Sequence, residues 1–139
     1  MDLTENDRKI LELLSKDSRA SYTDLSKELG ISDVAVKKRI DKLLSEGVIK
    51  NFTINIDYEK LGKPVYGIVL LKIIPKELER VKAFLEKTEE IISKKRVLGE
   101  YDFIIEIAAE SITKLKEFIE EKLGNVKGVI ETNTLILVE

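Results

Sequence analysis

Three helix-start signals, each followed by an apolar stripe of helical period, occupy the first 47 residues. Thr4, Ser21 and Ser32 stand where a helix N-cap is expected, and an acid follows the first two after three residues, at Asp7 and Asp24. This is the capping-box pattern, in which each side chain binds the other residue's backbone N–H. The apolar residues behind the three caps predict three short amphipathic helices: Ile10, Leu13 and Leu14; Tyr22, Leu25 and Leu29; Val36, Ile40, Leu43 and Leu44.

The second and third of these helices have the spacing of a helix-turn-helix. The second spans about two turns and ends at Gly30, because glycine readily adopts the positive φ of a helix C-terminus. The third opens at Ser32 after a tight turn through Gly30-Ile31 and ends at Gly47. This order predicts a DNA-binding motif whose second helix enters the major groove.

The third helix carries basic and small residues on the side away from its apolar stripe. Lys38 and Lys42 lie opposite the stripe, and Lys37 and Arg39 lie on its flanks. Small residues in the first turn suit an approach to base edges, while lysine and arginine bind phosphate. A solvated helix surface is the alternative, and the position directly after a capped helix and Gly30 favours DNA binding. The predicted contacts to double-stranded DNA are Ser32, Val34, Ala35, Lys37, Lys38, Arg39 and Lys42.

The overall charge does not by itself indicate a nucleic-acid partner. The 139 residues carry 24 Lys and Arg against 26 Asp and Glu, a formal net charge of −2. Residues 1–50 hold ten basic and ten acidic side chains, so this part is neutral. DNA binding must therefore depend on the local cluster in the third helix rather than on global charge.

Two residue types are absent, and this limits the catalytic and metal-binding chemistry that the protein can perform. The sequence has no cysteine and no histidine, which excludes disulfides, thiolate metal sites and every arrangement of a nucleophile with histidine. We therefore expect no enzyme activity, no metal site and no cofactor. No apolar run approaches the ~20 residues of a membrane span, and the first residues lack the regions of a secretory signal. The expected location is the cytoplasm, with no membrane partner.

A strand and a linker are expected after the helices. Residues 48–57 alternate between apolar and polar side chains, which predicts an extended strand. Gly62 and Pro64 then lie two residues apart in the segment 58–64, which is typical of a linker. The predicted organisation is a helix-turn-helix domain over 1–50, a strand and linker over 51–64, and a second domain over 65–139.

The second domain is predicted to have the element order β-α-β-β-α-β. Apolar periodicity and turn signals give strands and helices in this order: residues 65–74, a helix opening at Pro75, 92–98, 101–109, a helix capped by Ser111, and 129–138. The two middle strands are expected to form a hairpin around Gly99-Glu100. This is the order of a ferredoxin-like domain, an antiparallel sheet with both helices on one face, so the predicted fold class is α+β.

The first strand of this domain is apolar on both faces. Val69 and Leu71 point one way, and Ile68 and Leu70 point the other. The two helices can cover only one face, whereas a half-solvated sheet alternates apolar with polar residues. A second copy of the same sheet is the simplest cover for the other face. The pattern therefore predicts a homodimer.

Four segments within residues 3–62, followed by the Gly-x-Tyr-Asp sequence Gly99–Asp102, form two motifs along the chain. These motifs resemble those of the Lrp/AsnC, or feast/famine, regulators, and the likeness covers nearly the whole chain. A Gly-x-Tyr-Asp signature within Val97–Asp102 resembles the small-molecule domain of that family. Asp33 departs from the family pattern, which often has proline there, and this bears on the first-turn base contacts. The N-terminal likeness within residues 3–62 rests on four segments: Asp7–Leu11, Leu25–Ser32, Val36–Ile40 and Leu44–Lys50.

The resemblance implies a dimer that assembles further, to octamers or similar discs, and binds palindrome-like operators. It also implies that an amino acid or a related metabolite binds between dimers and changes assembly or DNA affinity. Both repressors and activators occur among such regulators, so the direction of regulation stays open.

The Gly-x-Tyr-Asp segment offers groups that suit a zwitterionic amino acid. Asp102 can pair with an ammonium group, and backbone N–H groups near Gly99 and Tyr101 can bind a carboxylate. A tight hairpin turn with a packed aromatic is the alternative for this segment. For the threonines of the last strand, the alternative is an ordinary role as strand residues. The predicted effector-binding residues are Gly99, Tyr101, Asp102, Thr132 and Thr134.

Three other functions fit the second domain alone. An RNA-binding module of this topology presents exposed aromatics and a basic residue on its third strand, but Glu100 and Asp102 would repel phosphate. A phosphate-binding enzyme of the acylphosphatase kind requires an arginine loop after the first strand, where this chain has Pro75-Lys76-Glu77. A metabolite-sensing module without operator binding is opposed only by the N-terminal half.

Overall fold

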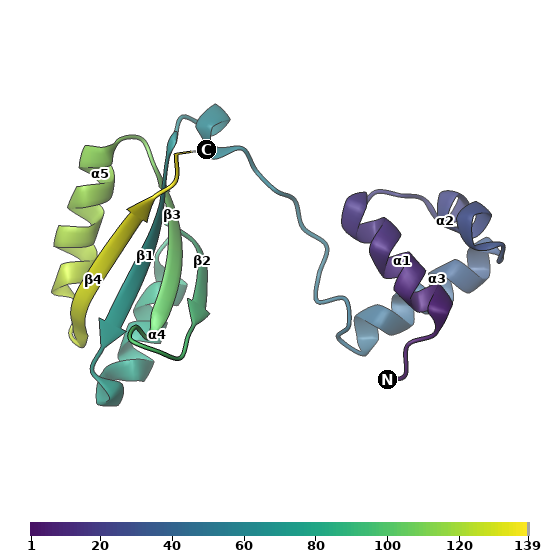
Figure 1. Ribbon diagram of the computed structural model, residues 1–139, viewed down its shortest axis with the longest axis horizontal. Helices are drawn as coiled ribbons and strands as arrows, with labels where there is room; N and C mark the ends of the chain where they lie inside the picture. Colours follow the sequence, from purple (N-terminus) through teal and green to yellow (C-terminus); the bar gives the residue numbers. More distant parts are fainter. Residues whose placement is uncertain (139) are drawn as a thin grey trace. The chain divides into compact units, whose positions relative to one another are not determined.

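The computed structural model describes residues 1–138. The chain divides into two compact units, Met1–Asn55 and Ile56–Glu139 (Figure 1). Each unit has its own apolar core. None of the helices in residues 1–138 combines the length and the apolar character that a bilayer crossing requires.

The first unit contains α1 (Glu5–Lys16), α2 (Tyr22–Leu29) and α3 (Asp33–Ser45). The Thr4 and Ser21 hydroxyls accept hydrogen bonds from backbone N–H groups three residues later, at 3.1 and 3.0 Å, and both reciprocal bonds are present. Gly30 ends α2 with φ +68°. The predicted helices, their caps and the helix-turn-helix order are therefore confirmed.

The core of this unit is formed by one apolar stripe from each helix: Ile10, Leu14, Leu25, Val36, Ile40 and Leu43. The stripe of the third helix also predicted Leu44, but this side chain is 37% exposed. Consecutive residues lie about 100° apart around a helix. With Leu43 at the centre of the contact, Leu44 is turned away from it.

The strand predicted over 48–57 does not form. The Ile49 N–H donates to Leu43 O at 3.0 Å in the turn after α3, and residues 51–57 belong to no helix or strand. A strand requires hydrogen-bonded neighbours, and residues 1–138 of one chain supply none here. Phe52, Ile54 and Ile56 consequently remain exposed, by 48, 76 and 44%.

The second unit is built on one antiparallel sheet with the strand order β2-β3-β1-β4. Its strands are β1 (Val65–Ile73), β2 (Ile91–Arg96), β3 (Phe103–Ala109) and β4 (Val129–Ile136). Its helices are α4 (Leu78–Lys87), after a 3-10 turn at Pro75–Glu77, and α5 (Ile112–Glu117), which continues as a π-helical turn at Phe118–Lys122.

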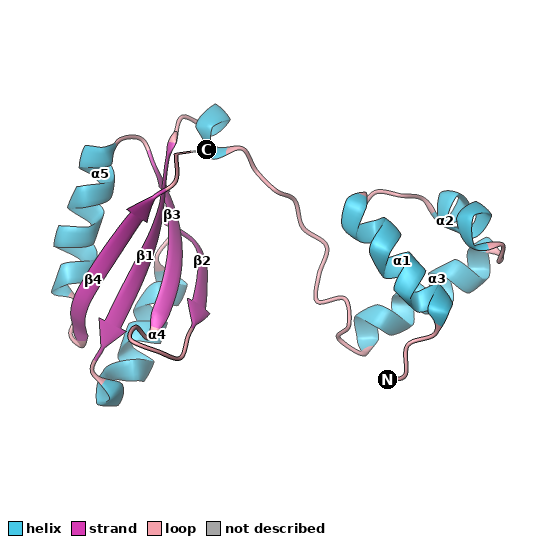
Figure 2. Ribbon diagram, in the orientation of Figure 1, coloured by secondary structure: helices cyan, strands magenta, loops and turns pink. Residues whose placement is uncertain are grey.

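Both helices lie against the same face of the sheet (Figure 2). Val81 and Leu85 of α4 and Leu115 of α5 pack on buried residues of β1 and β3. The predicted α+β class and ferredoxin-like order are therefore confirmed. The core that holds the two layers together consists of Val69, Leu71, Ile73, Val81, Leu85, Phe103, Ile105, Ile107, Leu115, Phe118 and Leu123.

The connection between β2 and β3 is longer than the predicted two-residue turn at Gly99-Glu100. It spans residues 97–102. The Val97 N–H donates to Asp102 O at 2.9 Å, and the Asp102 N–H donates to Leu71 O at 2.7 Å. Asp102 thus bonds to β1 and to the residue that follows β2 at the base of the connection, and the six residues 97–102 form a loop longer than a tight turn.

Candidate DNA-binding and effector sites

The N-terminus of α3 presents small, uncharged side chains to solvent. The Ser32 hydroxyl accepts from the Ala35 N–H at 3.1 Å, so this side chain is engaged as the helix cap. Val34 is 77% exposed and Ala35 is partly exposed. This surface has no charged group of its own except Asp33, whose carboxylate accepts from the Thr23 hydroxyl of α2 at 3.0 Å.

The Asp33 carboxylate is stabilised in its charged form by this arrangement. Hydrogen bonds from Ser26 and Thr23 lower the pKa of Asp33 below its ordinary value. The first turn of α3 therefore carries one negative charge held against α2. A negative charge at a helix N-terminus also interacts favourably with the helix dipole.

Three lysines of α3 are exposed, and they differ in their partners. The Lys37 ammonium lies 2.8 Å from an Asp41 carboxylate oxygen one helical turn away, and this contact raises the pKa of Lys37. Lys38 and Lys42 are exposed and take part in no ion pair within residues 1–138. These two lysines are the groups on the predicted basic face most available to a phosphate.

Arg39 lies on the flank of α3 and points into the first unit. Its Nε donates to Asp7 Oδ1 at 2.7 Å, and its Nη2 donates to Asp7 Oδ2. The Asp7 side chain is fully buried. The hydrogen bond from Arg39 is the largest cause that lowers the pKa of Asp7 to about 2, against the opposing effect of burial.

The sequence pattern predicts Arg39 as a DNA contact and Asp7 as part of the helix cap alone. The structure brings these two residues together over a separation of 32 positions. The sequence gives a weak indication of this contact, because Arg39 directly precedes the buried Ile40 and so borders the apolar stripe. An arginine at that border can reach a buried acid as well as solvent.

The β2–β3 loop is anchored by Asp102. Its carboxylate Oδ2 accepts from the Ile73 N–H at 2.8 Å, at the end of β1. With its backbone bonds to Leu71 and Val97, Asp102 ties the loop to the centre of the sheet. Within residues 1–138, its Oδ1 accepts no hydrogen bond from another protein group.

The tip of this loop is open. Leu98 is fully exposed, at 104%. Gly99 has φ +148°, a conformation that favours glycine, and a side chain there would meet nothing within 4 Å. Tyr101 is partly exposed, and its hydroxyl donates to Glu131 Oε1 at a long 3.5 Å. Gly99, Tyr101 and Asp102 are thus brought together in one loop.

Thr132 and Thr134 lie on the other face of the sheet. They pair with Leu71 and Val69 of β1, whose side chains belong to the core beneath the helices. Directly opposite residues share a face, whereas Glu131, which Tyr101 reaches, pairs with Lys72 on the outer face. The structure therefore separates the two threonines from the Gly-x-Tyr-Asp loop. Thr134 lines a groove of about 250 Å³ between α5 and β4.

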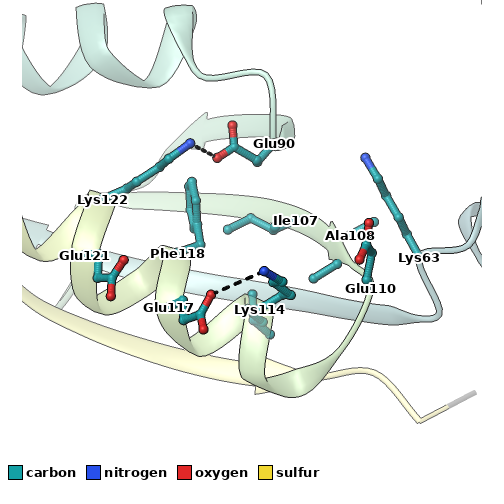
Figure 3. A pocket seen from close by; sticks show the side chains of 12 residues that line it. Lys63, Glu90, Ile107, Ala108, Glu110, Lys114, Glu117, Phe118, Glu121 and Lys122 are labelled. Atoms are coloured by element: carbon teal, nitrogen blue, oxygen red, sulfur yellow. Dashed lines mark hydrogen bonds and ion pairs between the residues drawn. The ribbon is translucent and has the colours of Figure 1, made fainter.

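A second groove, of about 490 Å³, lies beside α5 and its π-helical turn (Figure 3). Its floor is apolar, with Ile107, Leu115 and Phe118, and its rim is charged. Ion pairs join Lys122 with Glu90 and, at 3.7 Å, Lys114 with Glu117. None of the predicted effector residues lines this groove. No local sequence pattern predicts this groove, because its residues come from four separate segments.

The outer face of the sheet, which the helices leave uncovered, carries Tyr66, Ile68 and Leu70 of β1 in half-buried positions. The Glu106 carboxylate on neighbouring β3 accepts from the Tyr66 hydroxyl and the Ser93 hydroxyl, both at 2.9 Å. Burial, together with this carboxylate, raises the pKa of Tyr66 to about 12. The outer face is therefore an apolar surface around a paired polar centre.

Each half of the chain matches a known domain family. Residues 3–50 match the winged helix-turn-helix DNA-binding family, and residues 67–139 match the Lrp/AsnC ligand binding domain. The match over the N-terminal half supports DNA binding over a sensing module that lacks it.

Relatives and solved structures agree with these matches over the full length. The HTH-type transcriptional regulator LysM of Sulfurisphaera tokodaii is 36% identical over 137 residues, which cover 98% of this chain and 95% of LysM. The structure of LrpC from B. subtilis has a TM-score of 0.88 at 31% identity, covering 100% of this chain and 96% of that one.

A transcriptional regulator of Neisseria meningitidis, solved in complex with L-Met, has a TM-score of 0.91 and covers 99% of this chain and 91% of its own. Its identity of 19% makes this a likeness of fold alone. One conclusion follows from the two domain matches, from the full-length relative, and from the order of a helix-turn-helix and a ferredoxin-like unit. The chain belongs to the Lrp/AsnC family of DNA-binding transcriptional regulators, with a C-terminal ligand-binding domain.

Proposed function

We propose that this regulator is a homodimer that assembles further, binds specific operators through α3, and changes its assembly or DNA affinity when an amino acid or a close analogue binds near the β2–β3 loop. The observation that carries the effector part is the Asp102 carboxylate, which is anchored through Oδ2 and leaves Oδ1 without a protein partner in residues 1–138.

Operator binding rests on the outward surface of α3. Val34 and Ala35 in the first turn are small enough to approach base edges, and Lys38 and Lys42 are exposed for phosphates. Lys37 reaches DNA after giving up its Asp41 partner, an exposed ion pair of little energetic value. The remaining predicted contacts, Ser32 and Arg39, are occupied by the helix cap and by Asp7.

Dimerisation rests on the outer face of the sheet. Ile68 and Leu70 lie there, and an apolar sheet face left to solvent is unusual in a protein that stays monomeric. A second copy supplies an equivalent face, and two such faces pack as a sandwich with a closed two-fold symmetry. The hydrogen bonds to Glu106 keep its carboxylate paired when this face is covered.

The effector would lie beside Gly99–Asp102, where two copies or two dimers meet. Asp102 Oδ1 is suited to the ammonium group, and the open backbone around Gly99 to the carboxylate. The fully exposed Leu98 at the tip of the same loop gives the neighbouring dimer an apolar contact. The Neisseria meningitidis regulator of the same fold, solved with L-Met, supports an amino acid as the class of ligand.

A thermal-shift screen against the twenty standard amino acids tests the effector proposal. We expect at least one of them to raise the melting temperature of the parent protein. Asp102→Asn should lose this response, because the amide keeps an acceptor for the Ile73 N–H but lacks the charge that an ammonium group requires. Glu100→Gln, in the same loop, is the control and should respond like the parent.

Two further outcomes decide whether Asp102 binds the effector or only anchors the loop. Asp102→Ala, which removes the acceptor as well, should also lower the basal melting temperature. If Asp102→Asn lowers stability but keeps the full response, Asp102 is a loop anchor and not the ammonium partner. If no amino acid stabilises the parent, the amino-acid proposal is wrong.

A further inference from the structure

The pair formed by Asp7 and Arg39 has features that a surface ion pair lacks. Asp7 is the third residue of α1, and its side chain is fully buried. Both of its oxygens are used: Oδ2 accepts from the Thr4 N–H at 3.0 Å and from Arg39 Nη2, and Oδ1 accepts from Arg39 Nε at 2.7 Å. One carboxylate therefore caps the first helix and holds the middle of α3.

The two parallel hydrogen bonds from Arg39 to Asp7 restrict the relative orientation of the two side chains as well as the distance between them. The guanidinium group is planar, so a bidentate pair with a carboxylate holds both side chains in one plane. The apolar contact between the helices, through Ile10, Val36 and Ile40, is not directional in the same way. The ion pair therefore adds a directional restraint on rotation of α3 about its axis, beside the apolar packing.

Rotation of α3 matters because its DNA-facing residues are neighbours of Arg39. Lys38 precedes it, and Lys42 follows one helical turn later. Arg39 itself is mostly covered, with 28% of its side chain exposed, and its charge is paired inside the unit. It is therefore placed to orient the basic face rather than to form part of it.

We propose that Asp7 and Arg39 are positioning residues that set the orientation of α3 on α1, and that Arg39 contributes to operator binding through Asp7 rather than through a phosphate. This inference rests on the proposed operator binding by α3. It differs from the sequence-based interpretation, in which Arg39 contacts DNA directly.

A double-mutant cycle on operator binding tests this role in the full chain. Asp7→Asn and Arg39→Gln should each weaken operator binding by about tenfold while changing binding to random DNA by less than about twofold. In the Asp7→Asn background, Arg39→Gln should cost nothing further, because both changes remove the same pair. Arg39→Lys should behave like Arg39→Gln, since an ammonium group keeps a phosphate contact but not the planar pair.

Lys38→Gln is the matched control on the same helix. Because Lys38 is proposed to contact DNA directly, Lys38→Gln should weaken binding to operator and to random DNA alike. Its loss of affinity should add in full to that of Asp7→Asn when the two changes are combined. If Arg39→Gln is instead additive with Asp7→Asn, or if Arg39→Lys binds like the parent, Arg39 is a DNA contact and the proposal is overturned. Circular dichroism at the assay temperature identifies any variant that has unfolded.

A second measurement needs no DNA and so separates this proposal from operator binding. The chain has no cysteine, so spin labels can be attached at Lys9→Cys on α1 and Ser45→Cys on α3. Labelled chains diluted into excess unlabelled protein report the distance within one subunit. Asp7→Asn should shift or broaden this distance distribution. An unchanged distribution in the folded variant rejects the positioning role, whatever the outcome of the DNA assays.

Discussion

At the scale of single residues, chemical role follows from the partner that folding supplies. Arg39 and Lys38 are adjacent basic residues on one helix, yet one pairs with a buried carboxylate and the other is exposed. Asp102 and Glu100 are neighbouring acids of one loop, yet only Asp102 bonds to the sheet. Residue type alone does not distinguish the members of either pair.

The exposed lysines of α3 should dominate the salt dependence of DNA binding. Each phosphate contact releases counterions, so Lys38→Ala or Lys42→Ala should lower the slope of log affinity against log salt concentration by about 0.9. The loss should be similar for all DNA sequences, as measured by fluorescence anisotropy over a salt series. Lys116→Ala, an exposed lysine of α5, should leave the slope unchanged. Parent-like slopes for both α3 variants would contradict the assignment of α3 as the DNA-facing helix.

Asp7 should make the first unit sensitive to acid. Its pKa is lowered to about 2 in the folded protein from an ordinary value of 3.8. A group with a lowered folded pKa stabilises the fold fully above its unfolded pKa, and this contribution is lost as the pH falls from about 4 through about 2. Urea unfolding between pH 2 and 6 should show the parent converging on Asp7→Asn at the acid end. A constant difference between the two proteins over that range would rule out this linkage.

At the scale of elements, short-range patterns determine the helices, while strands depend on partners that lie elsewhere. The caps at Thr4 and Ser21 form locally, within three residues. The segment 48–57 has the alternation of a strand, but within residues 1–138 nothing pairs with it. An unpaired segment of this kind is a site at which another chain can add.

We expect residues 51–57 to gain backbone partners when the protein assembles. Phe52, Ile54 and Ile56 are exposed in the single chain, and pairing with another copy would cover them. Hydrogen exchange read by mass spectrometry should show protection of this segment in the assembled protein. The protection should be lost in a variant that cannot dimerise. Fast exchange in the assembled protein would argue against pairing.

At the scale of the whole molecule, the sheet has one apolar face that its helices leave uncovered, which is the face of the proposed dimer. Val69 and Leu71 point into the helix-covered core, at 0% exposure, so a charge there should unfold the unit. Ile68 and Leu70 point to the outer face. The two sets of residues therefore report on different properties, folding and assembly.

Leu70→Glu or Ile68→Glu should convert the assembled protein into folded monomers, because a charge at the centre of an apolar interface is left without a partner. Sedimentation velocity measures the mass, and circular dichroism verifies the fold. Lys116→Glu, at an exposed position of α5 on the helix-covered side of the sheet, is the control and should keep the assembly of the parent. A parent protein that sediments as a monomer would refute the sheet-mediated dimer.

The sequence by itself determined the features that depend on neighbours along the chain. The caps at Thr4, Ser21 and Ser32, the left-handed Gly30, and the order of strands and helices in the second unit could all be predicted from local pattern. Apolar periodicity identifies which side of a helix or strand is buried without reference to a partner. For the same reason the basic surface of α3 could be located in advance, whereas the Gly-x-Tyr-Asp loop was found through its resemblance to the Lrp/AsnC family.

Only the tertiary structure decided which groups meet across the chain. It paired Arg39 with Asp7, turned Thr132 and Thr134 to the face opposite Glu131, and attached Asp102 to β1. It made the connection between β2 and β3 longer than a tight turn. It also left residues 51–57 without a strand partner within residues 1–138. Hydrogen bonds and ion pairs act over about 3 Å between residues that may be dozens of positions apart, so no local pattern specifies them.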